Sequence, residues 1–328
     1  MPIIKYKDKT LAECLDEQEQ ADLLYFEGNA QTLRIITKLH SLTGNNGMHL
    51  TSSVMDAIIK YPVNSIQSRK AYLNGKNKPD LLHKKIGYYK SETEQFMEIK
   101  NNTGTLGCRN PLCFILEAAD DLAYTFADLE DGYKKGLYSY DALLDRVIQS
   151  NDIVGAELLV KSLEEGKALV SSSEKGFDPY LHAVFSSGVS DAFIENYDAI
   201  MNGEFCEELI AKSKEGVLIG ALKKFAYHKV YNDSAILKLE LMGNEIVSFL
   251  LDRFVNPLVL YDSGEQMSEI QEKYIDLLSR NYLNNYHVNS KGCSDHEKLY
   301  LRLLLATDFI SGMSDSYAKQ LYQELRGI

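Results

Sequence analysis

The segment 111–133 constrains the fold most strongly, because its apolar residues recur with the period of an α-helix. Asn110 can cap such a helix, and Pro111 suits its first position, where no amide hydrogen is required. At 100° per residue the apolar side chains fall within about 80° of one another. They are Ile115, Ala119, Leu122, Phe126, Leu129 and Tyr133. We therefore expect one long, mostly buried central helix that ends at Gly132 or Gly136.

The opposite face of this expected helix is acidic around a central tyrosine. It carries Glu117, Asp120, Tyr124, Asp128 and Asp131, and no Lys or Arg lies between residues 115 and 133. Such a face is either solvated, as most charge runs are, or one wall of a site for a divalent cation and phosphate, because carboxylates are natural ligands of hard cations. One helix cannot complete a metal site, so the second interpretation needs ligands from elsewhere.

The rest of the chain also favours helices. Capping-box patterns occur at Thr10, Ser91 and Ser294, each followed three residues later by Glu, and alternating strand patterns are scarce. We expect an all-α protein with roughly a dozen helices. A cluster of Gly and Ser at 166–179 is a candidate boundary or a long loop.

Composition excludes several classes of protein. The net charge of −12 argues against nucleic acid as the main partner, since the phosphate backbone requires a basic surface. Five cysteines without C-x-x-C spacing fit a reduced, cytoplasmic compartment. No signal-like apolar start is present, and the most apolar run, 246–261, is interrupted by Asp252, Arg253 and Pro257. We therefore expect no membrane span.

Five segments resemble deoxyguanosine triphosphate triphosphohydrolases, which are all-α enzymes of the HD phosphohydrolase superfamily. In chain order they are 25-YFEGNAQTLRIITKL-39, 84-KKIGYYKSE-92, 111-PLCFILEAADDLAYTFADLED-131, 237-LKLELMGNEIVSFLL-251 and 308-DFISGMSDSYA-318. The F-E-G-N-A-Q and E-A-A-D-D segments are specific, and the resemblance extends over nearly the whole chain from about Leu11.

The resemblance implies a function. In the family, water attacks the α-phosphorus of a deoxynucleoside triphosphate, and the products are a deoxynucleoside and inorganic triphosphate. The family binds a divalent metal such as Mg²⁺ or Mn²⁺ with an H…HD…D ligand set, whose last Asp matches Asp120. Tyr124 and Asp128 match positions that line the nucleotide pocket near the sugar.

Four more residues are candidate substrate contacts. Asn29 is expected either to cap a helix that begins near Ala30 or to contact the nucleotide. Lys84 and Lys85 are expected to pair with the triphosphate as point charges, and Tyr88 to stack on base or sugar. The alternative for these three is an exposed basic loop in which Ser91 caps the next helix.

The sequence departs from the family pattern at its most important motif. None of the seven histidines is followed by Asp, and only 25 residues precede Phe26. Three of the four metal ligands are therefore expected to be absent, the fold to be truncated on its N-terminal side, and metal binding to be weak or lost. We expect no catalytic residue in this chain and no appreciable activity of the chain alone.

The resemblance also sets expectations for domains and partners. Residues 1–165 are expected to form the remainder of the HD-type helical core, and 166–328 a C-terminal helical region packed on it, unless both form one domain. A deoxynucleoside triphosphate is the expected ligand. The chain is expected to form a homo-oligomer or to join an N-terminal region carried by another chain. The alternative functions are a non-catalytic nucleotide-binding or regulatory subunit, and a helical scaffold without a ligand.

Overall fold

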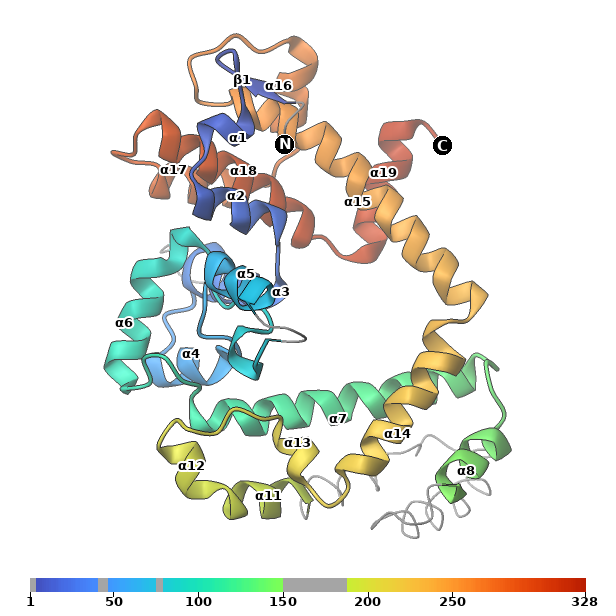
Figure 1. Cartoon of the computed structure of the whole chain (residues 1–328). Helices are drawn as coiled ribbons and strands as arrows, with labels where there is room; N and C mark the ends of the chain where they lie inside the picture. Colours follow the sequence, from blue (N-terminus) through green and yellow to red (C-terminus); the bar gives the residue numbers. More distant parts are fainter. Residues whose placement is uncertain (1–3, 41–46, 75–78, 150–187) are drawn as a thin grey trace. The chain divides into compact units, whose positions relative to one another are not determined.

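The protein is all-α, as the sequence predicts. The computed structural model describes residues 4–40, 47–74, 79–149 and 188–328, and helices make up nearly all of their regular structure (Figure 1). The described sheet is a small antiparallel pair of β1 (Lys5–Tyr6) and β2 (Lys9–Thr10).

The chain divides into two compact units. The first unit contains Met1–Met55, Tyr61–Gly107 and Leu241–Ile328, and the second contains Asp56–Lys60 and Cys108–Glu240. The boundary expected at 166–179 lies outside the described residues. Each unit is therefore described by itself.

The first unit is built from both ends of the chain. Its helices are α1 (Leu11–Cys14), α2 (Glu17–Leu24), α3 (Gly28–Arg34), η1 (Ile35–Leu39), α5 (Ser65–Asn74), η2 (Leu81–His83), η3 (Lys90–Glu92), α6 (Thr93–Thr103), α16 (Glu269–Asp276), α17 (Arg280–Asn289), α18 (Asp295–Ser311) and α19 (Asp315–Arg326). Two further helices, α4 (Ser52–Ile58) and α15 (Ser234–Leu260), belong partly to each unit.

Aromatic packing holds the C-terminal helices of the first unit together. The ring of Phe254 on α15 meets Phe309 on α18 edge to face at 5.0 Å, and Phe249 meets Tyr322 on α19 at the same distance. Such edge-to-face pairs stabilise a core beyond the apolar area they bury. Helix α15 continues through Pro257, although this residue removes one backbone hydrogen bond. Among the described helices, none has the length and apolarity needed to cross a bilayer.

The expected helix caps are partly confirmed. Thr10 begins α1 and Ser294 begins α18, each in a complete capping box. The expectation for Ser91 is wrong, because α6 begins after Glu92 and the Ser91 hydroxyl donates to the Glu92 carboxylate instead.

The second unit is organised on α7 (Pro111–Lys134), which is the long helix that the sequence predicts. The other helices are α8 (Tyr140–Ile148), α11 (Ser190–Glu195), α12 (Tyr197–Met201), α13 (Leu209–Lys212), α14 (Gly216–Ala226) and η5 (Tyr227–Tyr231). Asn110 caps α7 as expected, because its side chain accepts a hydrogen bond from the amide of Leu112.

The end of α7 corrects one expectation. Gly132 does not end the helix; it lies buried within it. A Cβ at this position would lie 2.6 Å from a methyl of Val230 and 3.1 Å from the Tyr138 ring, so glycine permits close packing here. Gly136 follows the helix with a φ of +70°, a conformation that glycine adopts readily.

Candidate functional site

The face of α7 opposite its buried side carries Asp120 next to a lysine. The Nζ of Lys60 donates to the Asp120 carboxylate at 2.5 Å, and the Asp120 side chain is 43% exposed. Lys60 is held in turn by Arg109, whose Nε donates to the Lys60 carbonyl and whose guanidinium pairs with Glu117 at 2.5 Å. The acidic segment itself contains no Lys or Arg, but Asp120 is paired with a lysine that lies 60 residues earlier in the sequence.

Two more carboxylates on α7 contact side chains of α14 and η5. The Nζ of Lys223 lies 2.7 Å from Asp121. The hydroxyl of Tyr231 donates to Asp128, and partial burial together with this carboxylate raises the pKa of Tyr231 to about 12. Between them Tyr124 is 66% exposed, so its ring is accessible from solvent. Asp120, the expected metal ligand, and Tyr124 and Asp128, the expected nucleotide contacts, therefore lie along one face of α7.

The residues around Asp120 do not form a metal site by themselves. Among the described residues, a group of three potential ligands that could hold one ion consists of Asp16, Glu19 and His296. Asp120 is not part of this group. Lys90 already lies within that group, with its Nζ 2.5 Å from Asp16 and 2.8 Å from Glu19. An ammonium at this position supplies the positive charge that a cation would bring.

A cavity of about 780 Å³ lies in the first unit and brings Lys84 and Lys85 together with aromatic rings. Both lysines are exposed, and Lys85 lies 3.5 Å from the carboxylate of Glu27, which also lines the cavity. The cavity is also lined by Arg69 on α5 and by three rings, those of Tyr25, Phe26 and Tyr72. No local pattern in the sequence indicates Arg69, because its position in the cavity depends on the packing of α2 against α5.

Asn29 lies beside this cavity but does not cap α3. The helix begins at Gly28, and Glu27 is its N-cap. The amide and the side-chain Nδ2 of Asn29 both donate to the Glu27 carboxylate, at 3.4 and 2.8 Å. The expected capping role is therefore wrong, and Asn29 instead helps to orient Glu27.

Tyr88 belongs to the core of the first unit. It is 6% exposed, and its ring stacks on Phe96 with the centroids 3.9 Å apart. Burial raises the pKa of its hydroxyl. One face of the ring that the sequence assigned to nucleotide stacking is thus occupied by a neighbour.

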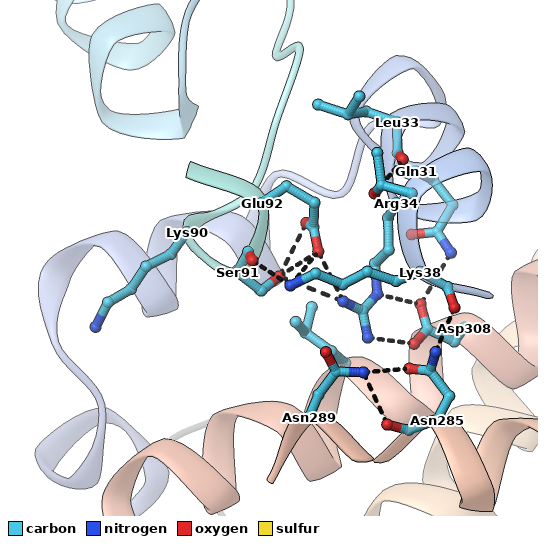
Figure 2. Close-up of polar contacts among 12 residues, drawn as sticks. Gln31, Leu33, Arg34, Lys38, Lys90, Ser91, Glu92, Asn285, Asn289 and Asp308 are labelled. Carbon is cyan, nitrogen blue, oxygen red and sulfur yellow. Dashed lines mark hydrogen bonds and ion pairs between the residues drawn. The ribbon is translucent and has the colours of Figure 1, made fainter. Parts of the chain in front are cut away.

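Three of the segments that carry the family resemblance meet in one buried ionic network (Figure 2). Arg34 on α3 makes two hydrogen bonds to Asp308 on α18, at 2.6 and 2.7 Å, and one to Glu92 at 2.9 Å. Gln31 also donates to Asp308, at 2.9 Å. Burial alone would lower the pKa of Arg34, but the charges of Asp308 and Glu92 outweigh it and raise the pKa.

Lys38 extends this network at its edge. Burial lowers the pKa of its ammonium group, although the Glu92 carboxylate lies only 3.4 Å away. The ammonium donates to the carbonyl of Ser91 (Figure 2). The network fixes α3 against the segment 84–92, and Lys84 and Lys85 of this segment line the cavity.

Comparisons with known proteins agree with these segments. The chain is 41% identical over 334 residues to a deoxyguanosinetriphosphate triphosphohydrolase-like protein of Listeria monocytogenes, covering 99% of this chain and 70% of that protein. It is 30% identical over 354 residues to a deoxyguanosinetriphosphate triphosphohydrolase of Yersinia enterocolitica, covering 97% of this chain and 66% of that protein. A Synechocystis protein with the same name as the Listeria one is 27% identical over 318 residues, covering 94% of this chain and 67% of that protein. No family model matches the chain.

Proposed function

Because this chain belongs to the deoxyguanosinetriphosphate triphosphohydrolase family, we propose that it takes part in the hydrolysis of a deoxynucleoside triphosphate to a deoxynucleoside and inorganic triphosphate. The observation that carries this proposal is the 41% identity to the Listeria protein over 99% of the chain. The accessible face of α7, where Asp120, Tyr124 and Asp128 lie in line, supports it.

Each residue of this face has a proposed role. Asp120 is one ligand of a divalent cation, and Tyr124 and Asp128 contact the sugar end of the nucleotide. The two aspartates are eight positions apart in the helix, so they lie about 12 Å apart along its axis. This span suits phosphates at one end and a deoxyribose at the other.

The chain alone is proposed to be inactive. A bound divalent metal would lower the pKa of a water and neutralise phosphate charge, but it requires several fixed ligands. The described residues provide Asp120, which is paired with Lys60, and no His is followed by Asp in the 328 residues. The remaining ligands would have to come from other residues, such as those of the Listeria relative that this chain does not match.

Release of triphosphate from dGTP tests the proposal. With Mg²⁺ or Mn²⁺, we expect no release above background from this chain. We expect release when it is mixed with the purified segment of the Listeria protein that lies outside the matched region. Release by the chain alone would overturn the proposed inactivity, and the absence of release from every combination would contradict the proposed reaction.

The second candidate is a nucleotide-binding or regulatory subunit. It is favoured by the Lys60–Asp120 ion pair and by the fact that, among the described residues, the group of three potential metal ligands does not include Asp120. Tight nucleotide binding without release in any combination would support this candidate. Self-association remains a prediction, to be measured by light scattering.

A further inference from the structure

The cavity of the first unit combines positive charge with exposed aromatic rings, and its recognition chemistry fits a nucleotide. We propose that it is a second site for a deoxynucleoside triphosphate, additional to the one proposed on α7, in which Arg69, Lys84 and Lys85 contact the phosphates and Tyr25 and Tyr72 contact the base. This proposal rests on the proposed function for its choice of ligand. The cavity's volume of about 780 Å³ is within the usual range of ligand pockets.

The charge of the cavity is opposite to that of the chain. Three cationic side chains and one carboxylate line it, whereas the chain as a whole has a net charge of −12. The single carboxylate, Glu27, already accepts hydrogen bonds from Asn29 and lies 3.5 Å from Lys85. A phosphate group would meet both the planar guanidinium of Arg69 and the ammonium groups, which are the preferred partners of phosphate oxygens.

The aromatic side chains lie at the cavity rather than in the core. Tyr25 is 43% exposed and Tyr72 is 54% exposed, and both line the cavity. The guanidinium of Arg69 lies over the Tyr25 ring, 5.4 Å from its centroid. Exposed rings next to cations are the usual platform for nucleobases, which stack on aromatic faces while their phosphates are neutralised.

The two walls of the cavity are held together by hydrogen bonds. On one side the hydroxyls of Ser68 and Tyr72 on α5 donate to the carbonyls of His83 and Lys84, both at 2.9 Å. On the other side the hydroxyl of the buried Tyr89 donates to the Glu27 carbonyl at 3.0 Å. The backbone that carries Lys84 and the ring of Tyr72 are therefore held in place before a ligand arrives, which lowers the entropy cost of binding.

The buried Asp22 connects the segments that line the cavity by hydrogen bonds. Asp22 accepts hydrogen bonds from Ser65, which lines the cavity, from the amide of Lys90 at 2.7 Å and from Tyr300 at 2.7 Å. Helix α5, the end of α2 and the segment 84–90 thus converge on one carboxylate, which makes the cavity a built part of the first unit.

Titration calorimetry with a matched pair of variants tests the site. Arg69 and Lys70 are adjacent exposed residues of α5, but only Arg69 lines the cavity. Arg69→Gln should weaken the binding of both dGTP and inorganic tripolyphosphate by roughly tenfold, and Lys70→Gln should change it by less than about twofold. Equal effects of the two variants would mean that net charge alone attracts the anion, and the site would be rejected.

A second pair separates the base from the phosphates. Tyr25→Leu should weaken dGTP binding but leave tripolyphosphate binding unchanged, and Tyr25→Phe should restore dGTP binding because it keeps the ring. A general loss of structure would instead weaken both ligands. Deoxyguanosine binding as tightly as dGTP, or no dGTP binding to the wild-type chain, would overturn the proposed phosphate contacts.

Failure of this site is distinguishable from failure of the proposed reaction. If dGTP binding responds to Asp120→Asn but not to Arg69→Gln or Tyr25→Leu, the cavity does not bind dGTP, while the proposed function stands. If binding responds to the cavity variants but no preparation releases triphosphate, the cavity is confirmed and the proposed reaction fails.

Discussion

Lys60 and Asp120 form an ion pair of 2.5 Å across 60 residues of sequence. The neighbouring Asp121 is paired in the same way with Lys223, 102 residues away. The centre of the acidic face of α7 is therefore balanced by cations from two other parts of the second unit. These two lysines reduce the electrostatic repulsion among the carboxylates of α7.

The first prediction concerns the energy of the Lys60–Asp120 pair. A double-mutant cycle with Lys60→Met and Asp120→Asn should give a coupling free energy of about 0.2–1 kcal/mol, because the pair is partly exposed and water screens it. Urea unfolding of the four proteins measures this coupling. A coupling of zero would show that the two side chains do not interact in solution.

Much of α7 follows from its sequence. The N-cap at Asn110, the proline at the first position and the burial of Leu122, Phe126 and Leu129 are all as predicted. Gly132 is different, because its role depends on Val230, whose approach is a property of tertiary packing. The local sequence pattern cannot distinguish a glycine that ends a helix from a glycine that allows another segment to pack closely against the helix.

Gly132→Ala tests this close approach. The added Cβ would lie 2.6 Å from a Val230 methyl, so the free energy of unfolding should fall by roughly 1–3 kcal/mol. Gly220→Ala on α14 is the matched control, because nothing lies within 4 Å of its Cβ position and alanine favours helices. If Gly132→Ala were as stable as the control, the close contact between Val230 of η5 and Gly132 of α7 would be contradicted.

Asp308→Asn should be strongly destabilising. It leaves the buried Arg34 guanidinium with Glu92 as its remaining carboxylate in the network, and breaking one side of such a buried pair costs about 3–5 kcal/mol. Thermal and urea unfolding measure the loss, with the exposed Asp252→Asn on α15 as the control for removal of a negative charge. Similar stability of the two variants would contradict the network.

The site was less predictable than the fold. Three of the segments that mark the family meet at Arg34, Glu92 and Asp308, and this convergence joins residues 274 positions apart. The sequence shows such residues as separate motifs, since no local pattern encodes a contact over that separation. Tyr88 illustrates the same limit, because its stacking on Phe96 follows from packing.

Asp22 should make stability depend on pH in an unusual direction for a carboxyl group. Burial raises its pKa above the ordinary 3.8, despite four hydrogen-bond donors. The folded state then binds the proton more tightly than the unfolded state, so this contribution is present below 3.8 and is lost as the pH rises through the folded pKa. Wild type should therefore lose stability relative to Asp22→Asn between about pH 3 and pH 6.5. Urea unfolding at both values measures the difference, and a relative gain would reverse the assigned direction.

The most direct test of the central claim compares Asp120→Asn with Asp121→Asn in the mixture of this chain with the unmatched Listeria segment. Both aspartates are on α7, both are partly exposed, and each is paired with a lysine, so the two variants differ mainly in the role proposed for Asp120. Release of triphosphate from dGTP with Mn²⁺ should be abolished by Asp120→Asn and largely retained in Asp121→Asn. Undiminished release in the Asp120→Asn mixture would contradict the assignment of this face as the metal–nucleotide wall.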